Sequence, residues 1–467
     1  MHMDANMNNS PAFGQAPATH DAEPFSRARL RQLLVAAVAL GGLGLTATPA
    51  HAVPAFARQT GQACIACHIG GFGPQLTPFG RAFKLGGYTL SNGKSHIPLS
   101  AMLVASYTHT TSDVQPNVDY NGEHANDNFV ALQQASIFLA GRITNHIGML
   151  GQATYEQATY SPNFGWDNTD IRYANDYKFG SVSGIFGVTL NNNPTVTDVW
   201  NTAPAWQYGF MSQPIGQVGS FPTPIIMNLG EAVLGTTAYT LVDNHWYVEA
   251  GVYHRLSARM SQAVNAASPD EISGYAPYWR VNYSTSKGNS SCEIGLTGMN
   301  VKVPANSPDF NISGANDSFK DLGIDGSYQY LDGDARSVTV NAMYMREHED
   351  YGAVGSGNAN SSDTLDYMNV NTAYWYQNTY GATIQFFDVT GSTDPLLYSS
   401  GNGYTNSNPN TSGVVWELDW NPFGKNWADP EKNLRLGLQY TTFNKIDGST
   451  QNASANNSLY LYLWTAI

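Results

Sequence analysis

Charged residues are scarce in this chain of 467 residues. Asp, Glu, Lys and Arg make up 12% of it, and the 22 basic residues are outnumbered by 36 acidic ones, so the net charge is −14. Ordinary soluble domains carry about 25% charged residues. An acidic chain with so few basic residues is not expected to bind nucleic acid. The low charge density and the 12% aromatic content also exclude a coiled coil and a disordered chain.

Long hydrophobic runs are also missing. After Ala52 no apolar stretch reaches the roughly 18 residues of a membrane-spanning helix. This excludes a helical polytopic membrane protein, although 42% of the residues are hydrophobic. Asn, Ser, Thr, Gly and Tyr take the place of charge. That composition favours a large β structure with water on one face and apolar surroundings on the other.

The N-terminus has the pattern of an export signal. Three arginines between residues 27 and 31 precede the apolar run 33–45, and Ala50-His51-Ala52 forms a cleavage site. The run is short for a bilayer span, so a signal anchor is the less favoured alternative. We therefore expect residues 1–52 to be a signal peptide. The exported chain is then either periplasmic or a barrel in the outer membrane of a Gram-negative bacterium.

Cysteine is rare as well, with only three in the chain. Two of them form the motif Cys64-Ile65-Ala66-Cys67-His68, the C-x-x-C-H pattern of haem attachment. Two thiols one helical turn apart reach the two vinyl groups of one haem, and His68 supplies the proximal iron ligand. A disulfide or a zinc knuckle is the alternative, but zinc would require further Cys or His nearby. The motif predicts one covalently bound haem c at Cys64, Cys67 and His68. Cys292 is expected on an apolar strand face.

The segment that carries the motif is short. Thr77 is a candidate N-cap and Pro78 a first helical residue, followed by two helical turns that end at Gly86-Gly87. Residues 53–97 can barely bury a haem alone, because a segment of this length cannot form a hydrophobic core large enough to enclose it. We expect this haem c segment to use the rest of the chain as its wall.

From Pro98 onward the hydrophobic pattern has a period of two, as in Leu434–Thr441, where apolar and polar residues alternate. About sixteen such segments begin near Pro98, Asn128, Asn145, Thr169, Ser181, Val233, His245, Ala276, Ser290, Phe319, Ala335, Thr364, Thr379, Ser412, Asn433 and Ser458. The pattern predicts that residues 98–467 form an all-β, transmembrane antiparallel barrel of about 16 strands. A soluble β-sandwich is the alternative.

Aromatic residues near strand ends are candidates for an interfacial girdle against outer-membrane lipid. They include Tyr328, Tyr330, Tyr374, Trp375, Tyr376, Tyr440, Tyr460, Tyr462 and Trp464. The stretch from Asn191 to about Met227 breaks the strand rhythm. It is either a loop folded into or over the lumen or an ordinary surface loop. Charge is expected in loops and at a few lumen positions such as Asp321, Asp325 and Arg435.

Several stretches together resemble one known family, the fused cytochrome–porin proteins in the outer membrane of iron-oxidising bacteria. Besides the haem motif they are Val53–Gly61, Leu76–Lys84, Asn191–Val196, Phe387–Thr393 and Asn433–Tyr440. The resemblance covers most of the mature chain. It implies a single haem c that plugs or lines a 16-stranded barrel. It also implies oxidation of extracellular Fe(II), the electron donor, and transfer of single electrons to a periplasmic c-type cytochrome, which is the activity of an iron:cytochrome c oxidoreductase.

The distal haem ligand has several candidates. Odd positions of Leu99–Tyr107 are expected to face lipid, which places Met102 in the lumen, and a His/Met ligand pair would raise the haem potential. A lumen methionine can equally be a packing residue, and His96 and His109 compete for the role. Separately, Glu347-His348-Glu349-Asp350 could attract iron cations, but a solvated loop is favoured because no metal-ligand spacing is complete.

Two other functions stay open. The chain could be an electron conduit whose donor is not aqueous iron, or a diffusion porin with a sensing or structural haem. Motifs of hydrolases, phosphate-binding loops and nucleic-acid readers are missing from the sequence, so no catalytic side chain is assigned.

Overall fold

The computed structural model describes residues 55–71, 73–94, 97–111, 119–120, 123–124, 128–155, 164–202, 221–264, 272–307, 310–354, 357–402, 404–424 and 433–466. These residues belong to one compact unit. The predicted signal peptide, residues 1–52, lies outside them.

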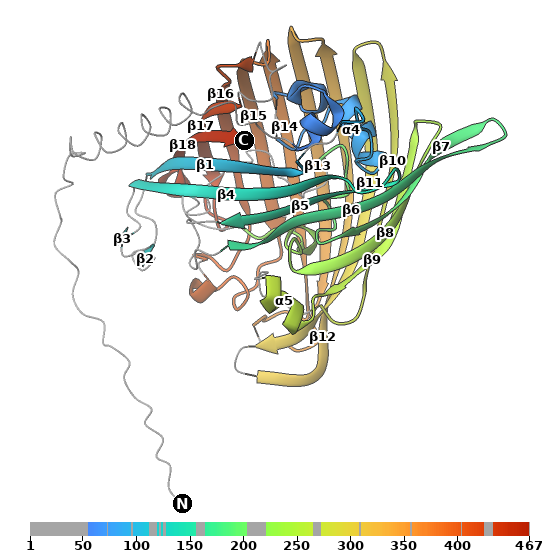
Figure 1. Ribbon diagram of the computed structural model, residues 1–467. Coiled ribbons are helices and arrows are strands. Elements are labelled where there is room, and N and C mark those ends of the chain that lie inside the picture. Colours follow the sequence, from blue (N-terminus) through green and yellow to red (C-terminus); the bar gives the residue numbers. More distant parts are fainter. Residues whose placement is uncertain are drawn as a thin grey trace, which may run out of the picture. The chain divides into compact units, whose positions relative to one another are not determined.

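Sixteen antiparallel strands form a closed barrel, which confirms the predicted fold (Figure 1). Each strand pairs with its neighbours in sequence, and β1 closes the ring by pairing with both β4 and β18. The strands are β1 (Leu99–Thr110), β4 (Asn128–Arg142), β5 (Ile147–Tyr155), β6 (Phe164–Phe179), β7 (Val182–Asn191), β8 (Val233–Val242), β9 (Trp246–Arg255), β10 (Ala276–Lys287), β11 (Ser290–Ser307), β12 (Phe310–Asp332), β13 (Arg336–Asp350), β14 (Ser362–Tyr376), β15 (Tyr380–Gly391), β16 (Thr411–Trp420), β17 (Leu434–Lys445) and β18 (Ser458–Ala466).

Strand boundaries agree with the sequence prediction except at two long strands. β12 begins at Phe310 and not near Phe319, and β6 begins at Phe164 and not near Thr169. Each strand begins with a brief alternation, Phe164 and Trp166 in β6 and Phe310 and Ile312 in β12. Polar or small residues follow, so the alternation is too short to mark a strand. A separate two-stranded sheet pairs β2 (Asp119–Tyr120) with β3 (Glu123–His124).

The outer face of the barrel is apolar and the inner face is mostly polar. In β13 the residues at odd positions are buried while Tyr344 and its even-numbered neighbours lie outside. Leu322, Leu418 and Ile294 are more than half exposed, whereas Asp321, Asp325 and Arg435 are buried, as predicted for lumen positions. This distribution matches a barrel whose outside contacts hydrocarbon, and closure leaves no unpaired strand edge in the bilayer.

The two ends of the barrel differ in their connections. Short turns join β4 to β5, β6 to β7, β8 to β9, β10 to β11, β12 to β13 and β14 to β15 at one end, here called the short-turn end. β1 begins and β18 finishes at this end, where the connection from β16 to β17 is the one longer link. At the opposite, long-loop end the connections are longer except between β11 and β12, which residues 308–309 join. An even-stranded antiparallel barrel with this asymmetry is the architecture of bacterial outer-membrane proteins. The chain is accordingly an outer-membrane barrel of a Gram-negative bacterium.

The predicted aromatic girdle is only partly correct. Tyr328, Tyr374, Tyr376 and Tyr440 face outward and are exposed. Four other members face the lumen and are buried, namely Trp375, Tyr460, Tyr462 and Trp464. They occupy the opposite parity of their strands, so strand alternation and not aromatic character decides where they point.

The helices are few and short. α2 (Ala55–Thr60), α3 (Cys64–Cys67) and α4 (Pro78–Leu85) precede the barrel, and α5 (Ala258–Val264) follows β9. Three 3-10 turns lie in connections: η2 (Ile225–Met227), η3 (Ser400–Asn402) and η5 (Ala453–Asn456). Within the described ranges, no helix has the length and apolarity needed to cross a membrane.

Candidate functional site

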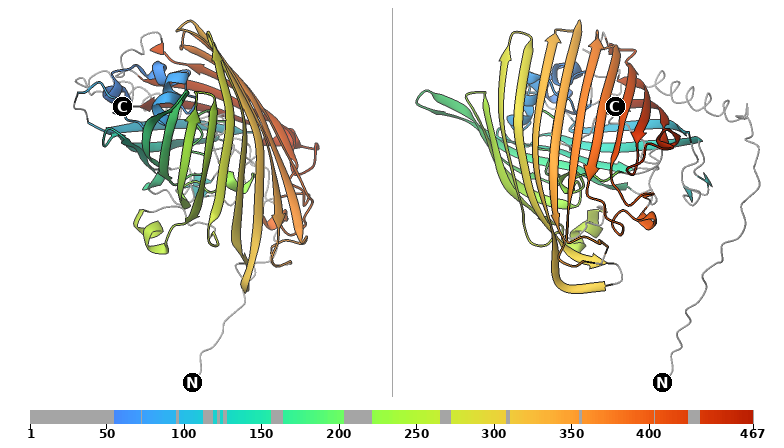
Figure 2. Two further views of the ribbon diagram at one scale, coloured as in Figure 1. Left: turned by 90° about the vertical axis from the view of Figure 1, so that its right-hand side faces the viewer. Right: turned by 180° about the vertical axis from the view of Figure 1, so that it is seen from behind.

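The N-terminal segment, residues 55–94, contains α2 to α4 and lies against the inner wall at the short-turn end (Figure 2). Thr77 accepts a hydrogen bond from the Gly80 backbone N–H, and α4 ends at Gly86, which confirms the predicted helix. Thr77 also donates to the Ala66 carbonyl, so the cap ties α4 to the haem motif. A Cβ at Gly80 would lie 2.3 Å from the Cys67 carbonyl oxygen. Glycine therefore permits the close packing of α4 on α3.

Polar contacts hold the N-terminal segment to the barrel wall. Arg81 donates to Gln329 at 2.6 Å and to Ser291 at 3.3 Å. Tyr88 donates to Asp170 at 2.7 Å. Because these partners lie on strands far apart in sequence, the segment uses the barrel as its wall, as the sequence analysis expected.

The two motif cysteines lie on α3 as free thiols. Cys64 is buried in a cluster with Met102, Val104, Tyr460, Tyr462 and Trp464, and Cys67 is partly exposed. Burial raises the pKa of Cys64 and of Cys67 to about 11 each, so both thiols are uncharged at neutral pH. A zinc site needs further Cys or His ligands, and no group of three His, Cys, Asp or Glu side chains that could hold a metal ion lies among the described residues.

His68 follows α3 directly and is oriented by its backbone surroundings. Its Nδ1 lies 2.6 Å from the Gly73 carbonyl oxygen. A protonated Nδ1 donating to this carbonyl leaves Nε2 as the nitrogen with a free lone pair, which is how proteins orient metal-binding histidines. Burial lowers the pKa of His68 to about 4, the Gly73 hydrogen bond opposes this shift, and Arg435 adds to it. The imidazole is therefore neutral, as metal binding requires.

These residues fit a haem c. Two neutral thiols one turn apart supply the attachment atoms, and the neutral imidazole presents Nε2. Across the part of the chain that is described, no group of three His, Cys, Asp or Glu side chains could hold a metal ion by itself.

The candidates for the distal ligand lie in different places. Met102 faces the lumen, as predicted, and shares the buried cluster of Cys64. His109 occupies the parity of β1 that faces outward, so its competing candidacy is wrong. His96 lies outside the described residues. Met102 as the distal ligand stays a prediction.

The described parts of the connection after β7, residues 192–202 and 221–232, fold into the lumen, as one of the two interpretations predicted; residues 203–220 lie outside the described residues. Residues 192–202, the inward loop, are almost entirely buried. Lys84 of the N-terminal segment donates to the Val196 carbonyl, and Thr197 donates to Glu249 on β9 at 2.9 Å. The loop thus packs between the N-terminal segment and the wall.

An ionic cluster fixes the inward loop near the middle of the barrel. Arg280 on β10 lies 2.7 Å from Asp325 on β12, 3.4 Å from Asp198 of the loop and 3.5 Å from Glu293 on β11. All four side chains are buried. One guanidinium therefore joins the inward loop to three neighbouring strands of the wall, β10, β11 and β12.

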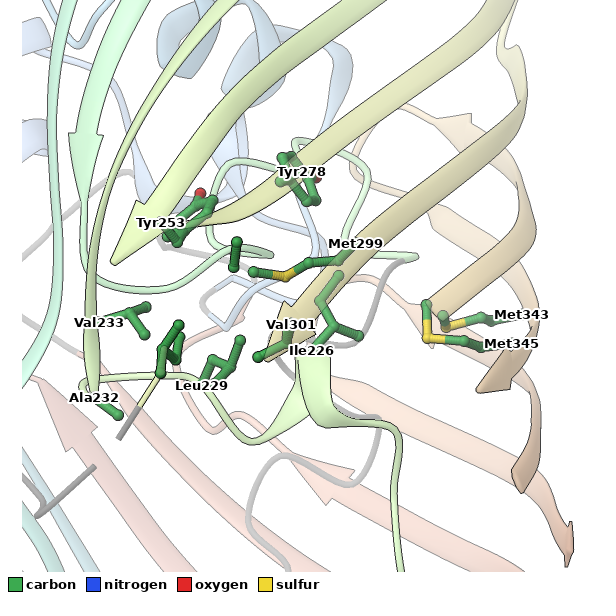
Figure 3. Close-up of a cluster of buried hydrophobic side chains, with 12 residues drawn as sticks. Ile226, Leu229, Ala232, Val233, Tyr253, Tyr278, Met299, Val301, Met343 and Met345 are labelled. Carbon is green, nitrogen blue, oxygen red and sulfur yellow. The ribbon is translucent and has the colours of Figure 1, made fainter. Parts of the chain in front are cut away.

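The same connection returns to the wall through an apolar cluster, drawn in Figure 3. Ile226 of η2 and Leu229 lie among Tyr278, Met299 and Val301 of neighbouring strands. This packing occupies lumen space toward the long-loop end.

The acidic stretch 347–350 is not the solvated loop that was favoured. All four residues belong to β13. Glu347 and Glu349 face the lumen and are buried, whereas His348 and Asp350 face outward. Glu347 accepts a hydrogen bond from the Ile225 N–H at 2.7 Å, so it anchors η2. The stretch alternates as a strand does, but its polar residues on both faces concealed the pattern.

Sequence reasoning missed the residues that hold the turn after His68. Arg435 and Asn421 donate to the Gly70 carbonyl, and the Trp375 ring lies against Gly70. Parity along β14 could have identified Trp375, because Tyr374 and Tyr376 on either side face outward.

Comparison with known proteins adds little beyond architecture. No family model and no curated protein sequence matches the chain. Among solved structures it is similar to Salmonella typhi OmpF in complex with daunomycin, with 12% identity, a TM-score of 0.44, and coverage of 79% of this chain and 97% of that one. The outer membrane channel DcaP of Acinetobacter baumannii matches with 11% identity, a TM-score of 0.43 and coverage of 79% and 96%. A loop L8 deletion mutant of Vibrio cholerae OmpT matches with 10% identity, a TM-score of 0.43 and coverage of 79% and 98%. The barrel assignment rests on the strand pairing of this chain itself.

Proposed function

We propose that this outer-membrane barrel is a single-haem electron-transfer protein that oxidises extracellular Fe(II) and passes electrons to a periplasmic c-type cytochrome. Cys64 and Cys67 would hold the haem covalently, and His68 would be its proximal ligand. A haem c at this position would accept and release one electron at a time, which matches the Fe(II)/Fe(III) couple.

One observation carries this proposal. The C-x-x-C-H motif lies inside the barrel with two free neutral thiols, and the Nδ1 of His68 is directed to the Gly73 carbonyl, so that Nε2 is available to iron. Fe(II) as donor comes from the family resemblance and not from the site.

The position of the motif suggests a direction of transfer. The N-terminal segment lies at the short-turn end, which faces the periplasm in bacterial barrels. A periplasmic cytochrome would meet the protein at this end. The donor would approach from the long-loop end, where buried Glu347 and Glu349 face the lumen.

A diffusion porin with a structural haem is the second candidate. The closed sixteen-stranded barrel with a polar inner face supports it, and on architecture alone it is the better supported of the two. The inward loop and the N-terminal segment argue against a wide pore, because they bury side chains such as Arg280 and Asn191 within the lumen.

The decisive experiment uses the purified full-length protein in detergent. A pyridine haemochrome spectrum after denaturation measures covalent haem, and Fe(II) is then added to the oxidised protein. We expect one haem per chain and conversion to the ferrous absorption spectrum. A loaded protein whose ferric spectrum does not change with Fe(II), but does change with dithionite, would contradict iron as donor and leave a conduit with another donor.

Liposome swelling with small neutral sugars tests the porin. We expect little flux for the wild-type protein. Equal, rapid swelling by the wild type and by the double variant Cys64→Ala/Cys67→Ala would favour the porin. Retention of Fe(II) oxidation by that variant would contradict a role for the haem in electron transfer.

A further inference from the structure

A compact group of side chains holds the turn that follows His68. Arg435 on β17 donates from Nη2 to the Gly70 carbonyl at 2.7 Å, and Asn421 donates to the same oxygen at 2.9 Å. The Arg435 guanidinium lies 4.7 Å from the centre of the Trp375 ring and 5.3 Å from the Trp464 ring. A planar cation between two aromatic rings is held in one orientation. Arg435 therefore fixes the carbonyl two residues beyond the proposed haem ligand.

The same guanidinium faces a pair of carboxyl groups. Asp419 on β16 lies 4.0 Å from Arg435, and Glu417 lies two residues away on the same inner face. Both carboxyl groups are buried. Two carboxylates beside a single guanidinium would leave one negative charge without compensation in a site with little water, which is costly.

Glycines make the room for this arrangement. The neighbours of Asp419 across the two adjacent strands are Gly381 and Gly437. A Cβ at Gly437 would lie 2.0 Å from the Tyr462 ring, and a Cβ at Gly381 would lie 2.8 Å from the Trp375 ring. Without side chains at these positions, Tyr462 and Trp375 can lie flat against the wall on either side of Asp419.

Hydrogen-bond counting indicates a proton on the carboxyl pair. The Tyr462 hydroxyl lies 2.6 Å from Asp419 Oδ1 and 2.9 Å from Glu417 Oε1. A phenol has one hydrogen to donate, so two separate, two-centre hydrogen bonds require that one carboxyl group is protonated and donates to the phenol oxygen. The shorter contact, to the carboxyl beside Arg435, is the one expected for an ionised acceptor. This assigns the proton to Glu417.

We infer that Arg435 is a positioning residue for the haem-ligand turn and that Glu417 and Asp419 share one proton that is exchanged with each electron. The inference rests on the proposed function. A haem held by Cys64, Cys67 and His68 would supply one-electron chemistry beside this turn. For each electron passed to a one-electron acceptor, Glu417 would release its proton to water. When an electron returns from the donor, a proton returns to Glu417. The midpoint potential should then fall as pH rises.

The other ionisable groups around the pair are few. Among the described side chains, Tyr462 of β18 contacts both carboxyl groups and Arg435 of β17 lies 4.0 Å from Asp419. Tyr460 and Cys64 belong to the same buried cluster as Tyr462, and His68 interacts with Arg435. The strand neighbours of Glu417 are Thr383 and Gln439, which do not titrate. The carboxyl pair is thus the acidic group that lies beside Arg435 and the turn it holds.

The test is a redox titration of the intact haem-loaded protein between pH 5 and pH 8, with chemical mediators in place of Fe(II). The wild-type potential should fall with pH by at most about 59 mV per unit, the value for one proton per electron. The variant Glu417→Gln should lose most of this slope, since its amide carries no titratable proton. Tyr462→Phe should change the slope while leaving both carboxyl groups, and serves if Glu417→Gln does not fold.

The matched control is Glu249→Gln, the same change at a buried lumen carboxylate that bonds Thr197 and Thr237 instead. It should keep the wild-type slope. Arg435→Gln should lower the potential at fixed pH because a positive charge near the site is removed, and Arg435→Lys should restore it in part.

Each outcome has a distinct meaning. A loaded wild-type protein whose potential is independent of pH, or equal slopes in Glu417→Gln and Glu249→Gln, would overturn the shared proton and leave the haem assignment intact. An Arg435→Gln potential equal to that of the wild type would overturn the positioning role. A protein without covalent haem would overturn this inference together with the proposed function, whereas failure of Fe(II) alone to reduce the haem would not affect it.

Discussion

Two buried arginines mark two regions of the lumen that are built in opposite ways. Arg280 lies among three carboxylates and joins the inward loop to the wall. The Arg435 guanidinium lies 4.0 Å from the Asp419 carboxylate and donates a hydrogen bond to the Gly70 carbonyl. It also lies over the rings of Trp375 and Trp464. Both side chains are almost completely buried. The first is held by carboxylates, and the second is held by a backbone carbonyl, an amide and two aromatic rings.

The difference separates a structural region from a responsive one. The Arg280 cluster holds the inward loop inside the barrel, because its guanidinium pairs with Asp198 of the loop as well as with the wall. Around Arg435, one guanidinium faces the two carboxyl groups of Glu417 and Asp419. A charge added nearby can therefore be compensated by the gain or loss of one proton at this pair. Buried ionic groups are therefore not equivalent in function merely because they are equally buried.

The largest expected effect concerns the haem motif. Replacement of both cysteines, Cys64→Ala/Cys67→Ala, should abolish covalent haem completely, because no thioether can form. The barrel should still assemble, since its strand pairing does not depend on α3. Haemochrome content and heat-dependent mobility in SDS gels measure the two properties. A variant that retains covalent haem would contradict the motif assignment.

The next effect concerns the Arg280 cluster. Arg280→Ala should destabilise the barrel by about 3–5 kcal/mol, because it leaves buried carboxylates uncompensated. The urea midpoint of unfolding in detergent measures this change. Arg346→Ala is the matched control, since Arg346 pairs with Asp366 on the exposed outer face, and it should cost at most about 1 kcal/mol. Equal losses in the two variants would mean that Arg280 does not anchor the inward loop.

A third effect depends on pH at the contact between the N-terminal segment and the inward loop. Burial lowers the pKa of Lys84 from 10.5 to about 8, and Arg172 adds to the shift. Between these two values the unfolded chain binds more protons at Lys84 than the folded chain, so stability rises with pH from about 8 to 10.5.

The gain should be at most about 3 kcal/mol, at 1.36 kcal/mol per pKa unit. Urea midpoints at pH 7.5 and 9.5 measure it, and Lys84→Met should remove this part of the dependence. The same rise in both proteins would show that other groups cause it.

The smallest effect concerns the helix cap. Thr77→Val should destabilise α4 by about 1 kcal/mol, because the Gly80 N–H loses its acceptor. Faster amide hydrogen exchange confined to residues 78–85 would be the signature. Thr285→Val, at an exposed position of β10, is the control and should leave exchange in α4 unchanged. Unchanged exchange in Thr77→Val would mean that the wall alone holds α4.

The fold could be predicted from the sequence because its signals are local. Period-two alternation in stretches such as Leu434–Thr441 gave the strands, and Thr77 with Gly86 bounded α4. The prediction failed where the apolar alternation was brief, as at Phe310–Ser318 of β12. It also failed where a side chain was placed by its residue type, as for Trp375 and Tyr462. The haem motif could likewise be recognised from neighbouring residues. The contact of Arg435 with the Gly70 carbonyl could not, because the two residues are 365 positions apart.

By itself the sequence determined that apolar and polar side chains alternate along each strand and that the number of strands is even. It also determined that Cys64, Cys67 and His68 lie within one short segment. Those properties follow from neighbouring residues, since side-chain period and helical turns act over a few positions. Only the tertiary structure decided that the loop after Asn191 enters the lumen, that Glu347 anchors it, and that Arg435, Glu417 and Asp419 meet at the turn after His68. These contacts form because closure of the barrel brings residues of distant strands to the same level along the barrel axis. No single stretch of sequence contains that information.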